Sequence, residues 1–185
     1  MERDCGMNIQ NLERNIVDLI EEEQIKLGYL SETVRLYYPL DSLNRFLQQE
    51  YDTAQMQAAL KEFSSHVQER LGEIQVSHKG SRFCLAVPPE GAAYIYKHSK
   101  KDGFLTDFIR TIEKHGCTLE DLLQQFWKYS CHVHVEKADH GEFDYLVYFE
   151  DGIPDEFRYC LTDEGCHMIY HRFTIDDYND FHFDE

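Results

Sequence analysis

The sequence lacks any long apolar run, and this absence excludes a first class of proteins. No stretch approaches the ~18 consecutive apolar residues that a membrane-spanning helix needs. The first residues, Met1–Asp4, lead directly into polar sequence and show no apolar core of a signal peptide. These absences predict a protein with no membrane segment that stays in the cytoplasm.

Motifs of known catalytic chemistry are also missing. The sequence contains no G-x-S-x-G, no P-loop, no G-x-G-x-x-G and no H-E-x-x-H. Its six cysteines include no C-x-x-C pair, and they are Cys5, Cys84, Cys117, Cys131, Cys160 and Cys166. We therefore expect free thiols in a reducing compartment and no cofactor. The missing motifs favour a non-enzymatic role over an enzymatic one.

Positive charge is scarce, above all in the second half of the chain. Residues 101–185 carry 7 basic and 20 acidic side chains, residues 1–100 carry 11 and 15, and the whole chain has a net charge of −17. An acidic surface repels phosphate backbones, so nucleic acid binding is disfavoured. The surface suits a basic protein partner, although the simpler interpretation is a solvated face that keeps the protein soluble.

The first half of the sequence changes its hydrophobic period part of the way along. Helical spacing predicts helices over residues 8–27, 42–50 and 53–71, with a short one between Ser31 and Pro39. Alternation then predicts strands over residues 74–78, 82–87 and 92–97. We expect residues 1–100 to be a helical region with a small basic β-hairpin or three-strand element, in the order typical of a winged helix.

The second half, residues 101–185, predicts two helices packed on a four-stranded antiparallel meander sheet. The helices are expected at 103–115 and 119–130, the second with a Thr118–Asp121 capping box, and a short helix after Thr174. The strands are expected at 131–138, 143–150, 156–162 and 166–173. The whole chain is therefore predicted to have an α+β fold with two regions that meet near residue 100.

Residue parity predicts which side chains of this second sheet are exposed, because successive side chains of a strand point to opposite faces. Odd-numbered positions are apolar and should pack on the two helices, whereas even-numbered positions are mixed. Three-residue loops that pair Ala138 with Glu142 and Thr162 with Cys166 would keep this parity through both hairpins. His171 would then lie on the side opposite to His132.

The even-numbered positions supply candidate metal and thiol sites. His132, His134 and Glu136 would point the same way, as metal ligands must, although two surface histidines on a half-wet sheet are the simpler alternative. Cys160 and Cys166 share a parity without lying directly opposite each other. A disulfide or thiolate site there competes with two separate, semi-buried thiols.

Four further even-numbered residues are candidate binding residues: Tyr148, Arg158, Tyr170 and Arg172. Aromatic rings beside arginines on an exposed sheet are suited to recognition of a partner. The same residues are equally suited to packing against the first half of the chain, with the arginines in weak surface ion pairs.

The segment Thr118–Phe181 carries a family resemblance. It reads TLEDLLQQFWKYS, then GEFDYLVYFEDG, then DEFRYCLTDEG and IYHRFTIDDYNDF. With these motifs the sequence resembles DUF3877, a bacterial domain family of unknown function found mostly in Firmicutes, and the resemblance extends over most of the chain. It implies a cytosolic bacterial protein, and it supplies no activity, ligand or catalytic residue.

Three functions remain open at this point. The first is a non-enzymatic cytosolic module that binds a protein or a ligand. The second is a winged-helix regulator made of residues 31–98, in which helix 53–71 enters the major groove and Lys79 and Arg82 contact phosphate. The third is a metal-dependent enzyme centred on His132 and His134. The sequence leaves the oligomeric state open.

Overall fold

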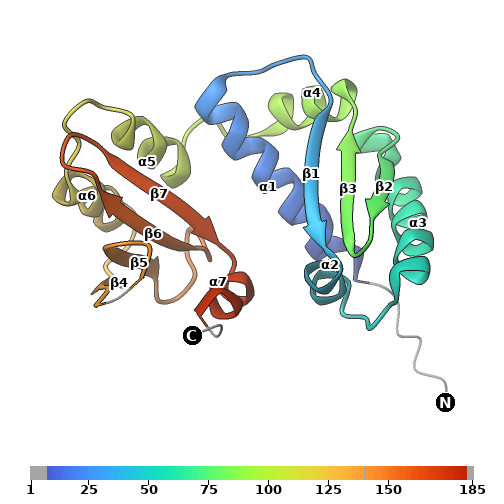
Figure 1. The fold of residues 1–185 in the computed structure, drawn as a ribbon. Coiled ribbons are helices and arrows are strands. Elements are labelled where there is room, and N and C mark those ends of the chain that lie inside the picture. The colour runs from blue at the N-terminus through green and yellow to red at the C-terminus, as the bar shows by residue number, and fades with distance from the viewer. Residues whose placement is uncertain (1–7, 140, 183–185) are drawn as a thin grey trace. The chain divides into compact units, whose positions relative to one another are not determined.

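The computed structural model describes residues 8–139 and 141–182 (Figure 1). The chain divides into two compact units, Met1–Ser99 and Lys100–Glu185. Over the described residues it contains seven helices, a three-stranded antiparallel sheet and a four-stranded meander, so the predicted α+β fold class is confirmed. No helix in these ranges is both long enough and apolar enough to span a membrane.

The N-terminal unit combines four helices with the three-stranded sheet, whose strand order is β1-β3-β2. Its elements in chain order are α1 (Ile9–Leu27), β1 (Val34–Pro39), α2 (Leu40–Leu47), α3 (Thr53–Leu71), β2 (Gln75–Lys79), β3 (Arg82–Val87) and α4 (Pro89–His98) (Figure 1). Both neighbours of β3 are antiparallel to it. The first strand of the chain is therefore hydrogen-bonded to the last strand of this unit.

One face of this sheet is covered by the helices. Their apolar stripes and the inward side chains of β3 form one core, in which the fully buried residues include Leu12, Ile16, Ile20, Leu43, Leu60, Phe63, Val67, Phe83 and Leu85. Each large apolar side chain that is removed from water contributes roughly 1.5–3 kcal/mol. Helix α3 begins at a capping box in which Asp52 and Gln55 satisfy each other's backbone N–H groups.

Two predicted elements of the N-terminal unit are wrong. Residues 34–39 form strand β1 and not a helix, because they alternate between the core and the exposed face and pair with β3 along their whole length. Residues 92–97 belong to helix α4 and not to a strand, because Pro89 at the first helical position starts a helix that buries Ala92 and Ile95. The unit has three strands as predicted, but the third one is β1.

The C-terminal unit packs two helices on one face of its meander sheet, in the order β4-β5-β6-β7. Its elements are α5 (Phe104–Ile112), α6 (Leu119–Tyr129), β4 (Val133–Lys137), β5 (Tyr145–Phe149), β6 (Arg158–Asp163), β7 (Met168–Phe173) and α7 (Ile175–His182) (Figure 1). The predicted helices, meander and final helix are all present. The capping box between Thr118 and Asp121 is confirmed.

The core of this unit is an aromatic cluster between the sheet and the two helices. Phe126 is fully buried, and its ring centroid lies 4.7 Å from that of Phe104, 5.1 Å from Phe149 and 5.3 Å from Tyr159. Phe108 packs edge-on against Tyr159. The side of the sheet that these residues occupy is called here the helix face.

The register of the last hairpin overturns the predicted parity of β7. Cys160 is opposite His171, and Leu161 is opposite Tyr170, so odd-numbered residues of β6 pair with even-numbered residues of β7. The turn begins after Asp163, which is opposite Met168, and not after Thr162. His171 therefore lies on the same side of the sheet as Cys160, and Tyr170 lies on the helix face.

The first hairpin keeps the predicted parity but not the predicted loop. Lys137 pairs with Tyr145, and the Ala138 N–H donates to the Asp144 carbonyl at 2.8 Å, so the connection is longer than the three residues expected. A change of two residues leaves every side chain of β4 and β5 on its predicted face. The side opposite to the helix face is called here the α7 face, because Tyr178 of α7 packs there with Leu146 and Cys160.

Candidate functional site

The α7 face uses two of the predicted binding residues for internal contacts. The Tyr148 ring lies between His134, stacked at 4.7 Å between ring centroids, and Arg158, whose guanidinium carbon is 3.6 Å from the ring centroid. These three residues come from adjacent strands, β4, β5 and β6. The cation–π contact with Arg158 therefore stabilises the sheet itself.

The other two predicted binding residues lie on the helix face. Tyr170 packs edge-on against Phe108 at 5.0 Å between ring centroids. The Arg172 side chain is only 3% exposed, lies over the Phe157 ring at 3.9 Å and forms an ion pair with Asp155 at 3.6 Å. The structure therefore does not bring the four residues together on one surface, and a binding role for them stays a prediction.

Only two of the three candidate metal ligands are in contact with each other. His134 lies in β4, and its Nε2 is 3.2 Å from the Glu136 carboxylate, whereas His132 precedes the strand. Within residues 8–139 and 141–182, no three His, Cys, Asp or Glu residues are grouped so that they could hold a metal ion. Metal binding at His132, His134 and Glu136 remains a prediction.

The cysteines of the described residues are free thiols, as expected, and they do not form a common site. Cys160 is buried on the α7 face, and Cys166 is exposed in the turn between β6 and β7. Burial raises the pKa of the Cys160 thiol to about 12. Cys5 lies outside the described residues.

The raised pKa of Cys160 predicts a loss of stability at high pH. An unfolded thiol titrates near ~8.5, so stability falls between that pH and about 12, by up to ~1.4 kcal/mol per pH unit from this one group. Urea unfolding of Cys160→Ala should therefore show a shallower decline from pH 8.5 to 10.5 than the wild-type chain. The exposed-site variant Cys131→Ala should keep the wild-type slope, and equal slopes for all three would contradict the prediction.

The N-terminal sheet carries a second candidate surface, which we call the basic face. It is the side of the sheet turned away from the core, and its positions are Arg35, Tyr37, Pro39, Gln75, Ser77, Lys79, Arg82, Cys84 and Ala86. These nine positions include three cations and no carboxylate, in a chain whose net charge is −17. Tyr37 is 57% exposed near the middle of the face, with Arg82 at 5.7 Å from its ring centroid.

Two cations of the basic face stand directly opposite each other. Lys79 and Arg82 form the last pair of the β2–β3 hairpin. Like charges in a direct cross-strand pair destabilise a sheet, because their Cβ atoms are only ~5 Å apart. An anionic group that bound between the two side chains would relieve this repulsion.

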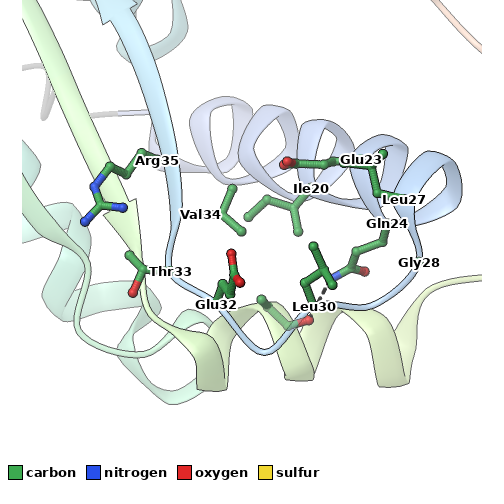
Figure 2. Close-up of a pocket in the computed structure, with 11 residues that line it drawn as sticks. Ile20, Glu23, Gln24, Leu27, Gly28, Leu30, Glu32, Thr33, Val34 and Arg35 are labelled. Atoms are coloured by element: carbon green, nitrogen blue, oxygen red, sulfur yellow. Dashed lines mark hydrogen bonds between the residues drawn. The ribbon is translucent and has the colours of Figure 1, made fainter.

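A shallow hollow of about 130 Å³ lies between the end of α1, the segment that leads into β1, and α4 (Figure 2). The Gln24 amide donates to the Ala92 carbonyl at 2.9 Å. Figure 2 shows the Arg35 guanidinium pointing away from the hollow. Ligand pockets for small molecules are usually about 300–1,000 Å³. The hollow is therefore too small for a typical metabolite.

Sequence reasoning missed one of the three strands of the basic face. The sequence predicts a basic β-hairpin that includes Lys79 and Arg82, but it assigns Arg35 and Tyr37 to a short helix. The available signal was the alternation of three apolar residues, Val34, Leu36 and Tyr38, with the two exposed side chains, since valine and tyrosine favour strands. A period of two over these residues would have placed Arg35 and Tyr37 on one face of a strand.

The comparisons with known proteins identify a family. No curated protein and no solved structure matches the chain. The family described as "Domain of unknown function, E. rectale Gene description (DUF3877)" matches residues 9–182, which include nearly all of both units. The chain therefore belongs to the DUF3877 family.

Proposed function

We propose that this chain is a non-enzymatic interaction protein whose N-terminal unit binds an acidic segment of a partner protein on the basic face. The observation that carries the proposal is the set of three cations without a carboxylate at nine sheet positions, with Lys79 and Arg82 directly opposed. A cytoplasmic location is part of the proposal, and the free thiols support it.

The chemistry of the face favours a carboxylate-bearing protein. Arg35 and Arg82 can each donate two parallel hydrogen bonds to a carboxylate, and the exposed Tyr37 offers an aromatic contact near the centre. Arginine and tyrosine are the residues that most often dominate binding energy at protein interfaces. An acidic segment with an apolar or aromatic side chain among its carboxylates would engage both features.

We also propose a winged-helix-like shape for this unit, without the DNA contact of a regulator. The order α1-β1-α2-α3-β2-β3 with sheet order β1-β3-β2 is the order of that fold. The helix that would read the major groove is α3, and there the Arg70 guanidinium is held by Glu13 through two hydrogen bonds of 2.7 and 2.9 Å. Lys61 is its other basic residue, and Glu62 is exposed beside it, so phosphate contacts along α3 would be few.

Charge reversal on the basic face is the test of the proposal. The double variant Lys79→Glu plus Arg82→Glu should weaken binding of a labelled oligoglutamate peptide to the full chain by at least about tenfold, because two charge-assisted contacts become repulsive. Fluorescence anisotropy at low salt measures the affinity. Adding salt should weaken the wild-type complex, since the contacts are exposed.

A matched variant on α3 separates the two kinds of partner. Lys61→Glu changes one exposed cation of the same unit and should leave peptide affinity unchanged. A 20-base-pair duplex is the competing probe, and tighter binding of the duplex, weakened by Lys61→Glu, would replace this proposal with a winged-helix regulator. Failure of the peptide to bind at low salt, or full affinity in the double variant, would overturn it.

A further inference from the structure

The turn between β6 and β7 holds three chemically active side chains at close range. It is fixed at its base by the Asp163–Met168 pair, and across the turn the Glu164 N–H donates to the His167 carbonyl at 3.0 Å. Gly165 adopts a φ of +85°, a conformation that glycine allows without strain. This backbone places Cys166 and His167 beside Glu164 on an exposed surface of the C-terminal unit.

The three side chains form a chain of contacts from sulfur to carboxylate. Cys166 Sγ lies 3.1 Å from His167 Nδ1, and His167 Nε2 lies 3.2 Å from a Glu164 carboxylate oxygen. An ionised carboxylate can only accept hydrogen bonds. To donate one to Glu164, the neutral imidazole must carry its hydrogen on Nε2. The lone pair of Nδ1 then faces the thiol. Because the two ring nitrogens point to different partners, the arrangement is a proton relay and not a metal chelate.

We propose that Cys166 is a reactive thiol that forms mixed disulfides with low-molecular-weight disulfides, with His167 as its proton acceptor and Glu164 as the positioning residue. A nucleophile within hydrogen-bonding distance of a base that is itself oriented by a third group is the arrangement that activates side-chain nucleophiles. Cys131 is the other exposed cysteine of this unit, and among the described residues it has no such contact with a histidine. The proposal concerns the C-terminal unit and is independent of the basic face.

The charges around the turn determine which class of small disulfide is attracted to Cys166. Asp163 at the end of β6 and Glu164 in the turn are both exposed, and the carboxylate of Asp144, in the neighbouring loop, accepts the Asp163 N–H at 2.8 Å. Glu142 lies in the same loop, and its carbonyl accepts a bond from Thr162. His167 is the sole side chain of residues 163–167 that can carry a positive charge. A cationic disulfide is therefore attracted to Cys166, whereas an anionic one is repelled.

The reaction balances without a further reagent. His167 Nδ1 takes the Cys166 proton, and the thiolate attacks one sulfur of the small disulfide. A new S–S bond forms as the old one breaks, and the departing thiolate leaves with the proton from the imidazolium. The products are the mixed disulfide at Cys166 and one small thiol, which is ordinary thiol–disulfide exchange.

The test measures the rate of modification at each cysteine of the reduced full-length chain. Cystamine, a dication, and oxidised glutathione, an anion, are the two probes, and peptide mass spectrometry of acid-quenched samples resolves the sites. At pH 7 and low salt, Cys166 should react with cystamine about tenfold faster than Cys131. It should also react faster with cystamine than with oxidised glutathione, and added salt should reduce that preference.

Two variants separate the relay from simple exposure. His167→Gln should lower the Cys166 rate about tenfold at pH 7 and make that rate depend more steeply on pH, because the thiol proton must then go to solvent and not to Nδ1, while Cys131 is unaffected. Glu164→Gln should shift the pH profile of Cys166 in the same direction. Equal rates at Cys131 and Cys166, or an unchanged profile in His167→Gln, would overturn the proposal, and a preference for oxidised glutathione would overturn the assigned ligand class.

Discussion

Replacing Phe126 with alanine is expected to lower the free energy of unfolding of the C-terminal unit by about 3–5 kcal/mol. The side chain is fully buried, and its ring contacts those of Phe104, Phe108, Phe149 and Tyr159. These partners come from α5, β5 and β6, so the surrounding rings cannot all move inward to fill the cavity. The loss therefore includes both the transfer of the ring to water and a large cavity term.

Trp127 makes this prediction measurable for one unit alone. It is the single tryptophan of the chain, lies in α6 next to Phe126, and is 48% exposed. Its fluorescence during urea unfolding follows the C-terminal unit. If Phe126→Ala fails to fold, Phe126→Leu provides a smaller, measurable loss. Ile175→Ala, which shortens a 44% exposed apolar side chain in α7 of the same unit, should change the stability by less than ~0.5 kcal/mol. A cost below ~1 kcal/mol for Phe126→Ala would contradict the aromatic core.

Replacing Gly91 with alanine is expected to destabilise the N-terminal unit by about 3 kcal/mol or more, although alanine is the better helix former. In an exposed helix this change would stabilise by up to ~1 kcal/mol. At Gly91, however, a Cβ atom would lie 2.2 Å from the Leu71 carbonyl oxygen and 2.8 Å from a Val87 methyl group. The oxygen belongs to the backbone at the end of α3, so relief requires α4 to move away from α3.

A second glycine supplies the matched control for this prediction. A Cβ atom at Gly80 would meet nothing within 4 Å, and its cost comes only from the φ of +58°, roughly 1–2 kcal/mol. Gly91→Ala should therefore be clearly more destabilising than Gly80→Ala when unfolding is followed by hydrogen exchange of the α3 and α4 amides. A neutral or stabilising Gly91→Ala would show that α3 and α4 are not packed as described.

The elements that could be predicted from sequence are those whose signals are local. The capping boxes at Asp52 and Thr118 start helices at the expected places, because the cap residues contact each other within one turn. The faces of β4, β5 and β6 followed from their alternation. Strand β1 could not be recognised as easily, because its pairing partner β3 lies more than forty residues away in the chain.

The predicted parity of β7 was wrong for a different reason. To predict the parity of β7, one needs the exact number of residues in the turn between β6 and β7. The sequence Asp163-Glu164-Gly165 is compatible with several turn types, so that number could not be determined. The observed turn places Asp163 opposite Met168, and Tyr170 therefore packs in the aromatic core. The candidate site was affected in the same way, because the basic face requires three strands to be placed in register before its cations are seen together.

The β6–β7 register also limits how this family can vary in length. One residue gained or lost between Asp163 and Met168 would, through a shifted register, send His171 toward Phe108 and turn Tyr170 toward α7. The longer β4–β5 connection can take up a change of length within the loop, without a shift of register. Natural relatives should therefore show insertions and deletions after Ala138 far more often than in the four residues that follow Asp163.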